Sequence, residues 1–229
     1  ETIPTLWACL WRKPCGGCGP CWDRHPHGGS LWQKEYAGEE FSALRLEEGD
    51  FRGVLFEDCL FTDCRFQGLS FQGCRFTGCH FARCRLGGLS FDNVQAMGNS
   101  FEDCAVLGID WAALLDPRKQ DLGFLPFDSF ARCTLHHCLF FHLELGKFSF
   151  AGCDLSGSFF EDCRLSGADF SGCLLRGAAF SHNDLSGADF RGAAEYGFSI
   201  EGNQVKGAKF SMPEAISLLY GLGLEIDGG

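Results

Sequence analysis

The 229-residue sequence lacks the long apolar runs that membrane-spanning helices require. It contains no stretch of about 20 consecutive apolar residues and no visible signal peptide. Basic residues are scarce, because 19 Lys and Arg stand against 30 Asp and Glu, which gives a formal net charge of −11. An acidic chain is poorly suited to nucleic acid. We therefore expect a cytoplasmic protein that contacts neither a membrane nor nucleic acid directly.

Signatures of catalysis are missing as well. No glycine-rich phosphate-binding loop follows a candidate strand, and no carboxylate pair stands out from the other surface charges. His136 and His137 precede Cys138, but Cys138 occupies a position expected inside the fold, where a Cys–His nucleophile would be buried. We expect no enzyme, no catalytic residue and no cofactor.

Neither the 3.6-residue period of a helix nor the 2-residue period of a flat strand is present. Instead, every fifth residue from Phe41 to Trp111 and from Phe130 to Phe210 is Phe or another apolar residue, with Glu195 the clear exception. Of the 24 Phe residues, 18 lie on this register. The backbone must then turn a corner in each unit and point the register residue inward. The predicted core ladder includes Phe56, Phe61, Phe71, Phe81, Phe160, Phe170, Phe180 and Phe190.

Fifteen cysteines would suggest a disulfide scaffold, but eleven of them lie two residues before a register residue. Leu69, Val94 and Ala168 occupy the same position in other units. We interpret this position as a slot for a small or medium apolar side chain, and a free cysteine packs as one. The eleven cysteines expected to be reduced are Cys59, Cys64, Cys74, Cys79, Cys84, Cys104, Cys133, Cys138, Cys153, Cys163 and Cys173.

Residues 1–34 lack the register and contain the other four cysteines. Two successive Cys-x-x-Cys steps with histidines nearby suit a zinc ion or an iron–sulfur cluster. The candidate ligands are Cys15, Cys18, Cys21 and His25. They are crowded and no second knuckle follows, so we favour a poorly ordered segment without metal and leave the metal site as the alternative.

Units such as Ala168-Asp169-Phe170-Ser171-Gly172 resemble the pentapeptide-repeat signature, Ala-Asp/Asn-Leu/Phe-x-x. The resemblance covers roughly residues 36–210. It implies an all-β fold, a right-handed quadrilateral β-helix with four units per coil and coils about 4.8 Å apart. This pentapeptide-repeat solenoid would carry a short C-terminal capping helix.

In that geometry, residues twenty apart stack on one face. Two ladders of alternating charge are then predicted, and opposite charges would favour the stack. Their members are Asp63, Arg83 and Asp103 in one, and Glu144, Arg164 and Asp184 in the other. Arg45, Arg65 and Arg85 should form a stripe of like charge, which a structural role alone does not explain.

The register divides the chain into a first repeat block, 35–111, and a second, 128–210. Residues 112–127 interrupt it, and Trp111 to Phe130 is 19 residues, one short of a multiple of five. The last segment, 211–229, resembles a helix start with Ser211 as N-cap, Pro213 in the first turn and Glu214 completing a capping box.

The helix should end at Gly221, and Leu222 to Ile226 could form a short strand. Its apolar face would cover the open end of the stack or form a dimer surface. Both roles stay open. The residues expected there are Ile216, Leu219, Tyr220 and Leu222.

The repeats, the single interruption and the C-terminal helix together resemble the bacterial quinolone-resistance (Qnr-type) proteins. That resemblance implies a homodimer that binds and protects DNA gyrase or topoisomerase IV from drugs or toxins. It also implies that 112–127 is the working loop, whose return Phe127 helps to anchor. The partner-binding residues would be Asp116, Pro117, Arg118, Lys119 and Phe124. The alternatives are an irregular coil that restarts the register, and a scaffold for an unrelated partner.

The family is thought to imitate duplex DNA, which carries one negative charge per ≈1.7 Å. The two repeat blocks together carry −10. Spread over a rod of about 40 Å, this gives one charge per roughly 4 Å, less than half the density of DNA. Mimicry would need the acids on one face, and the arginine stripe argues against it.

Overall fold

The computed structural model describes residues 35–115, 124–220 and 222–224. The chain divides into two units, 1–31 and 32–229, and the described residues all belong to the second. Several predictions concern residues outside the described ranges, namely Cys15, Cys18, Cys21, His25, Asp116, Pro117, Arg118, Lys119, Gly221 and Ile226.

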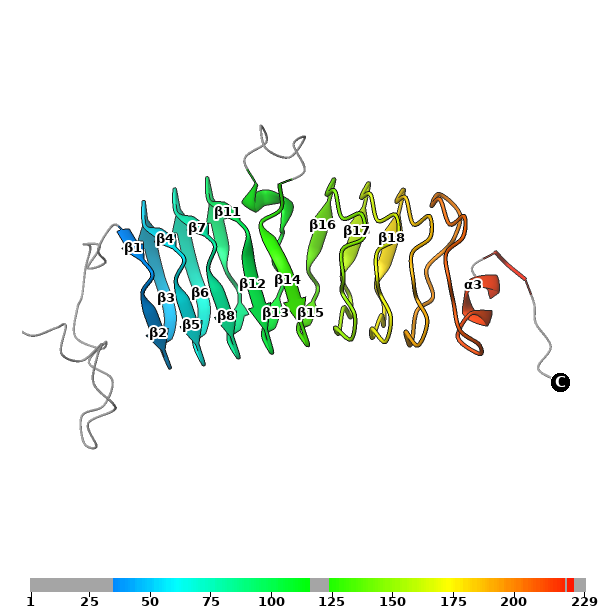
Figure 1. Cartoon of the computed structure of the whole chain (residues 1–229), viewed down its shortest axis with the longest axis horizontal. Coiled ribbons are helices and arrows are strands. Elements are labelled where there is room, and N and C mark those ends of the chain that lie inside the picture. Colours follow the sequence, from blue (N-terminus) through cyan, green and yellow to red (C-terminus); the bar gives the residue numbers. More distant parts are fainter. Residues whose placement is uncertain (1–34, 116–123, 221, 225–229) are drawn as a thin grey trace, which may run out of the picture. The chain divides into compact units, whose positions relative to one another are not determined.

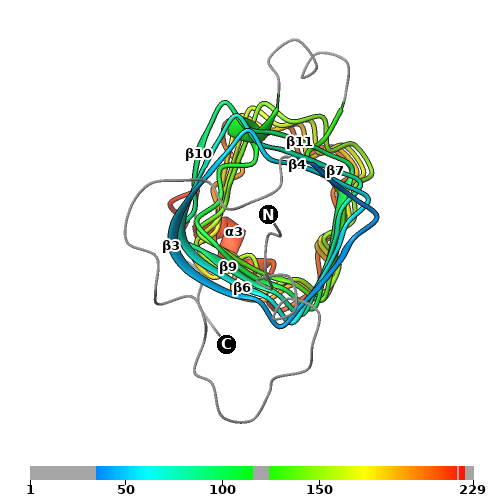
Figure 2. The ribbon, with the colours of Figure 1, turned by 90° about the vertical axis from the view of Figure 1, so that its left-hand side faces the viewer.

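The second unit is a parallel β-solenoid with four sides (Figure 2). The chain runs clockwise as it recedes from the viewer in Figure 2, so the coil is right-handed. Each strand pairs with the strand one coil later, as Tyr36 pairs with Phe56 and Phe56 with Phe76. The predicted fold class is confirmed.

The strands form four groups along the solenoid (Figure 1). The first side contains β1 (Glu35–Ala37), β4 (Leu55–Glu57), β7 (Arg75–Thr77) and β11 (Gln95–Met97). The second side contains β2 (Glu40–Ser42), β5 (Leu60–Thr62), β8 (His80–Ala82), β12 (Asn99–Glu102) and β14 (Phe127–Ala131). The third contains β3 (Arg45–Arg52), β6 (Arg65–Gln72), β9 (Arg85–Gly87), β13 (Ala105–Leu107) and β15 (Thr134–His136). The fourth contains β10 (Ser90–Asp92), which pairs with the end of β6, and then β16 (Leu139–Phe141), β17 (Phe159–Glu161) and β18 (Ala179–Ser181).

Each unit turns two side chains inward: the register residue and the residue two before it, which we call the inner slot. All eight residues of the predicted core ladder are buried. On the second side, register phenylalanines stack in one column from Phe41 to Phe210, with ring centroids 4.8 Å apart at Phe61–Phe81 and 4.9 Å at Phe170–Phe190. The widest spacing, 6.1 Å, lies between Phe130 and Phe150.

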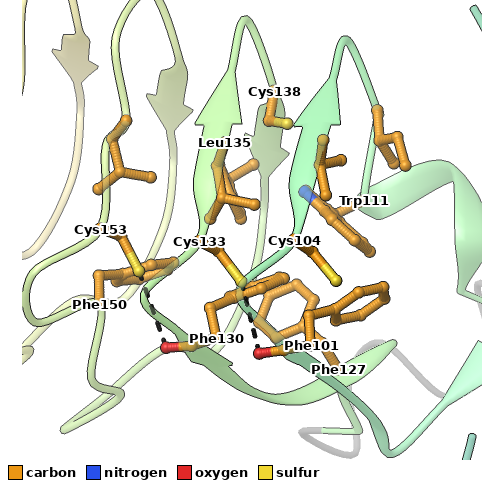
Figure 3. Packing of buried hydrophobic residues seen from close by; sticks show 14 of the residues in the cluster. Phe101, Cys104, Trp111, Phe127, Phe130, Cys133, Leu135, Cys138, Phe150 and Cys153 are labelled. Atoms are coloured by element: carbon orange, nitrogen blue, oxygen red, sulfur yellow. Dashed lines mark hydrogen bonds between the residues drawn. The ribbon is translucent and has the colours of Figure 1, made fainter. Parts of the chain in front are cut away.

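The inner slot is more than apolar filling, and our interpretation of it was incomplete. Cysteine thiols in the slot donate to the carbonyl of the register residue in the preceding coil, as Cys84 does to Phe61 at 3.3 Å. Figure 3 shows the same bond from Cys133 to Phe101. The buried polar residues Asn99, Ser158 and Asn183 occupy the same slot and make the equivalent bond. The slot therefore serves to satisfy a buried carbonyl as well as to fill space.

All eleven repeat cysteines are free and buried. Loss of solvation on burial raises the pKa of Cys79 and of Cys173 to about 12. The thiols of Cys79 and Cys173 are therefore protonated donors at neutral pH, as bonds to carbonyl oxygen require.

The C-terminal helix is shorter than predicted, since α3 spans only Ile216–Tyr220. The predicted capping box is wrong, because α3 begins only at Ile216, and the Ser211 hydroxyl instead accepts the N–H of Gly192 in the preceding coil at 3.2 Å. Leu222 donates to the Leu219 carbonyl in a turn, so the predicted strand does not begin there. Leu218, which the sequence did not single out, is the buried residue of α3. Over the described residues, no helix has the length and apolar character needed to cross a membrane.

Candidate functional site

The regular coil is broken at one corner, where the fourth side meets the first. Before the break, Phe81 pairs with Phe101, twenty residues on, but Phe101 pairs with Phe130, which is nine residues further than the period requires. The additional residues fall between Trp111 and Leu125, since Trp111 donates to Leu139 and Gly98 to Leu125 across the coils. Figure 1 shows this corner between β11 and β16. We call it the interrupted corner.

The chain leaves the solenoid through a short, well-anchored segment. The Asp110 carboxylate accepts the N–H groups of Ala112 and Ala113 at 3.0 and 3.3 Å. The 3-10 turn η1 (Ala112–Leu114) follows, and Leu115 after it is buried. Trp111 packs its ring 5.2 Å from the ring of Phe127. The departing limb is thus held by backbone bonds and by the core.

The returning limb is held by backbone bonds from Gly98 and Asn99 and by one polar side chain. Asn99, fully inside the solenoid, donates to the carbonyls of Pro126 and Phe76 at 2.9 and 3.1 Å. Its Oδ1 accepts the N–H of Cys79 at 3.0 Å. Phe127 is fully buried, as an anchor of the return should be. One signal in the sequence could have identified Asn99, because it is a polar residue in an inner slot close before the interruption.

A groove lies on the first side against the interrupted corner. It has a volume of about 290 Å³, and Phe124, 45% exposed, forms part of its wall. The floor contains Arg75, for which the described residues supply no ion-pair partner. Of the residues predicted for partner binding, Phe124 alone is described. The other lining residues are Leu55, Phe56, Glu57, Thr77, Gln95, Ala96, Met97 and Leu115.

An apolar patch lies on the other side of the same corner. Leu139, Phe141 and Phe159 belong to β16 and β17 on the fourth side, and we call them the fourth-side patch. Phe159 is 46% exposed. The patch adjoins the departing limb, because Leu139 forms a β-bridge with Asp110. Sequence reasoning missed these residues because Phe141 and Phe159 are off the register.

A second exposed apolar surface lies at the C-terminal end, and we call it the C-terminal surface. Of the residues predicted for capping or dimerisation, Ile216 is half-buried, whereas Leu219, Tyr220 and Leu222 are exposed, Tyr220 by 57%. Met212 and Leu224 are exposed beside them in sequence. The predicted residues are therefore more exposed than a simple cap requires.

Charged side chains follow the predicted twenty-residue stacking. Arg83 forms a bidentate pair with Asp63, with N–O distances of 2.8 and 2.9 Å. Arg132 binds Asp103 at 2.7 Å, and its guanidinium lowers the pKa of that carboxyl. Arg164 pairs with Glu144 at 3.3 Å in the second predicted ladder. In the part of the chain that the structure describes, no group of three or more His, Cys, Asp or Glu residues could hold a metal ion.

Several solved structures resemble this fold. A trypsin-treated variant of QnrB1, a plasmid-mediated fluoroquinolone resistance protein, is 20% identical and aligns over 85% of this chain and 99% of its own, with a TM-score of 0.35. Full-length QnrB1 is also 20% identical, over 83% of this chain and 100% of its own, with a TM-score of 0.30. HetL from Nostoc sp. strain PCC 7120, involved in heterocyst differentiation regulation, is 14% identical over 76% of this chain and 84% of its own, with a TM-score of 0.30.

A comparison with curated proteins finds no match. Family models do match the repeats. The model for nine copies of pentapeptide repeats matches residues 51–95, and the pentapeptide repeat region model matches residues 128–210. These two segments make up more than half of the chain and coincide with the five-residue register on either side of the interrupted corner. The chain belongs to the pentapeptide-repeat family.

Proposed function

We propose that this protein is a non-catalytic binding protein that engages a type II topoisomerase, DNA gyrase or topoisomerase IV, and protects it from quinolone-like drugs or toxins. The observation that carries the proposal is the interrupted corner. It is an insertion in an otherwise uniform solenoid, anchored at both limbs and leaving Phe124 exposed beside a groove. The Qnr-type resemblance of the sequence supplies the identity of the partner.

The anchoring of the two limbs supports a binding role for the segment between them. A loop that merely restarted the register would need no dedicated contacts, yet Asp110 and Asn99 fix its two ends. Loops positioned by a rigid scaffold are common binding elements. Exposed aromatic side chains such as Phe124 are typical of interface centres.

The C-terminal surface supports homodimer formation in the same proposal. Leu218 already covers the last coil, so the exposed Leu219 and Tyr220 are not needed for capping. Contiguous exposed apolar side chains are characteristic of interaction sites in soluble proteins. A second copy would bury them.

Two features of the charge and thiol chemistry fit a cytoplasmic binding protein. Eleven free thiols suit a reducing compartment. Burial raises the pKa of Cys138 to about 11, which disfavours the thiolate that a nucleophilic mechanism needs. Imitation of DNA is not required by the proposal, because arginines neutralise several of the surface carboxylates.

A second candidate function is a scaffold for an unrelated protein partner. The fourth-side patch favours it, because Phe159 is an exposed apolar side chain one coil away from the interruption. A partner bound there would need no insertion.

The deciding experiment measures gyrase supercoiling in the presence of ciprofloxacin. Deletion of residues 115–123 removes the nine inserted residues and restores the period of five between Trp111 and Leu125. We expect this variant to fold, as judged by circular dichroism, and to lose protection. Phe159→Ala, on the fourth-side patch, is the matched control and should protect like the parent protein.

Two outcomes would contradict the proposal. If the parent protein changes drug sensitivity at no concentration, the partner is wrong. If the deletion variant protects as well as the parent while Phe159→Ala does not, the fourth-side patch is the binding surface.

A further inference from the structure

The three arginines that the sequence pattern aligned form a continuous row on the third side. Arg45 pairs with Arg65 in β3 and β6, and Arg65 pairs with Arg85 in β6 and β9. All three side chains are exposed. Adjacent strands are about 4.8 Å apart, so the guanidinium groups leave the sheet at that interval along the solenoid axis. We call this row the arginine stripe.

Two arginines of the stripe lack the neutralising partners that the arginines of the second block have. Arg65 pairs with Glu47 at 3.5 Å, but Arg45 and Arg85 have no acidic group within ion-pair distance among the described residues. The arginines of the second block each have a carboxylate partner; they are Arg132, Arg164, Arg176 and Arg191. Like charges directly opposite on neighbouring strands are destabilising. In a chain of net charge −11, a row of three cations with a single carboxylate partner therefore indicates an external anion.

One exposed apolar side chain lies near the end of the stripe. Gly87, two residues after Arg85, is buried beneath the side chains of Gln67 and Leu107. One coil further, Leu107 of β13 pairs with Gly87 and is 50% exposed. The three cations are thus followed, one coil further and two residues along the strand, by one exposed apolar side chain.

We propose that the arginine stripe and Leu107 bind an acidic α-helix of a protein partner, lying along the solenoid axis. A helix rises 1.5 Å per residue, so carboxylates at i, i+3 and i+7 lie at 0, 4.5 and 10.5 Å, close to the spacing of three coils. An apolar residue at i+10, at 15 Å, would reach the coil of Leu107. Arginine binds carboxylates through two parallel hydrogen bonds, which favours it over lysine for such a row.

A protein partner fits this surface better than nucleic acid. The net charge of −11 repels a polyanion at long range, whereas a short acidic helix needs only the local field. The third side faces away from the first side, which holds the groove (Figure 2). The inference therefore does not depend on the proposed function, and both surfaces can be occupied together.

The test measures binding of a fluorescent alanine-based helical peptide with Glu at i, i+3 and i+7 and Leu at i+10. The variant is Arg45→Gln/Arg85→Gln, which leaves the Arg65–Glu47 pair intact. The control is Arg164→Gln/Arg176→Gln, which removes two positive charges that already have partners. Exposed ion pairs are individually weak, so we expect the variant to lower affinity by roughly three- to tenfold and the control by less than twofold.

Further results separate the alternatives. A peptide with Gln in place of each Glu should bind the parent protein no more tightly than the acidic peptide binds the variant. Added salt should weaken the complex between the parent protein and the acidic peptide. Equal binding of the acidic peptide to variant, control and parent overturns the proposal, as does absence of binding. Preferential binding of duplex DNA by the parent, lost in the variant, overturns the choice of a protein partner. All three proteins should show the same far-UV circular dichroism, since the substituted side chains are exposed.

Discussion

The two repeat blocks follow one five-residue period but close their corners with different hydrogen bonds. In the second block, the N–H of Cys153 donates to the Phe150 carbonyl at 2.9 Å, and that of Ala168 to Leu165 at 3.0 Å. No bond of this kind joins register residue and inner slot in the described residues of the first block. There, a buried register carbonyl such as that of Phe61 depends on a thiol from the following coil. The second block is therefore stabilised locally as well as between coils.

Glycine accompanies most of these turns but does not by itself produce them. Gly152 and Gly167, between register residue and slot, have φ of 69° and 68°, which a hydrogen-bonded type II turn requires at its third residue. In the first block Gly53 and Gly73 hold the equivalent position with φ of 62° and 60° but without the bond, and Asp58 and Asp63 hold it with φ of 49° and 55°. The left-handed conformations of the two aspartates are strained. Contacts with neighbouring coils therefore stabilise these corners more than the turns themselves do.

The blocks also differ in how completely the core is filled. About 70 Å³ of empty space remains between side chains of the first block, Phe71 among them. In the second block Phe170 is fully buried between Phe150 and Phe190, with ring centroids 5.2 and 4.9 Å away. The interior of the first block is therefore filled less completely than the stack around Phe170.

Removing one ring from each block gives the largest expected effect. Large-to-small substitutions of buried Phe cost about 3–5 kcal/mol of unfolding free energy. We expect Phe170→Ala to lie near the upper end and Phe71→Ala near the lower, because Phe71 already borders empty space. Urea denaturation followed by circular dichroism measures both. A greater loss for Phe71→Ala would reverse the comparison of packing.

The outline of this comparison could be predicted from the sequence, but its chemistry could not. The five-residue period identifies Phe71 and Phe170 as core, and the twenty-residue rule gives the Arg83–Asp63 pair. A pattern of inward residues says nothing about which carbonyl a slot side chain meets, so the bond from Cys84 was missed.

The same limit applies at the candidate site and at the C-terminus. Phe159 is off the register, and its place beside the interrupted corner follows only once coils are stacked across the insertion. The helix signal at Ser211 was misleading because a neighbouring coil supplies a donor, Gly192, that competes for the hydroxyl. Tertiary contacts overrode a local capping pattern there.

A smaller effect should distinguish inner slots of the first block, where the thiol alone meets the register carbonyl, from those of the second block that also have the turn hydrogen bond. Cys84→Ala leaves the Phe61 carbonyl without its buried donor, and we expect a loss of about 1 kcal/mol or more in unfolding free energy. Cys153→Ala should cost less, because its thiol bond to Phe130 is long, at 3.7 Å, and the backbone of residue 153 is held in a turn. Cys84→Ser should recover most of the loss, as Ser158 makes the equivalent bond at 2.7 Å. Equal losses of unfolding free energy in the two alanine variants would show that only the volume of the slot side chain matters, and not its hydrogen bond.

Acid titration gives the smallest effect, and it tests the contrast in charge pairing. Hydrogen bonding to Arg191 lowers the pKa of Asp189 to about 2. Because this pKa lies below the ordinary value of 3.8, the pair stabilises the fold at pH values above about 4, and the contribution disappears as the pH falls towards 2. The unfolding free energy of Asp189→Asn should therefore fall less steeply than that of the parent protein between pH 4 and pH 2. The difference should be at most about 1 kcal/mol, because the pair lies near the surface. Asp92→Asn in the first block, where Asp92 accepts a bond from the uncharged Gln72 amide, is the control and should leave the steepness of that decline closer to that of the parent protein. A decline that is equally steep in all three proteins would mean that the paired carboxylates of the second block contribute nothing to the difference between the blocks.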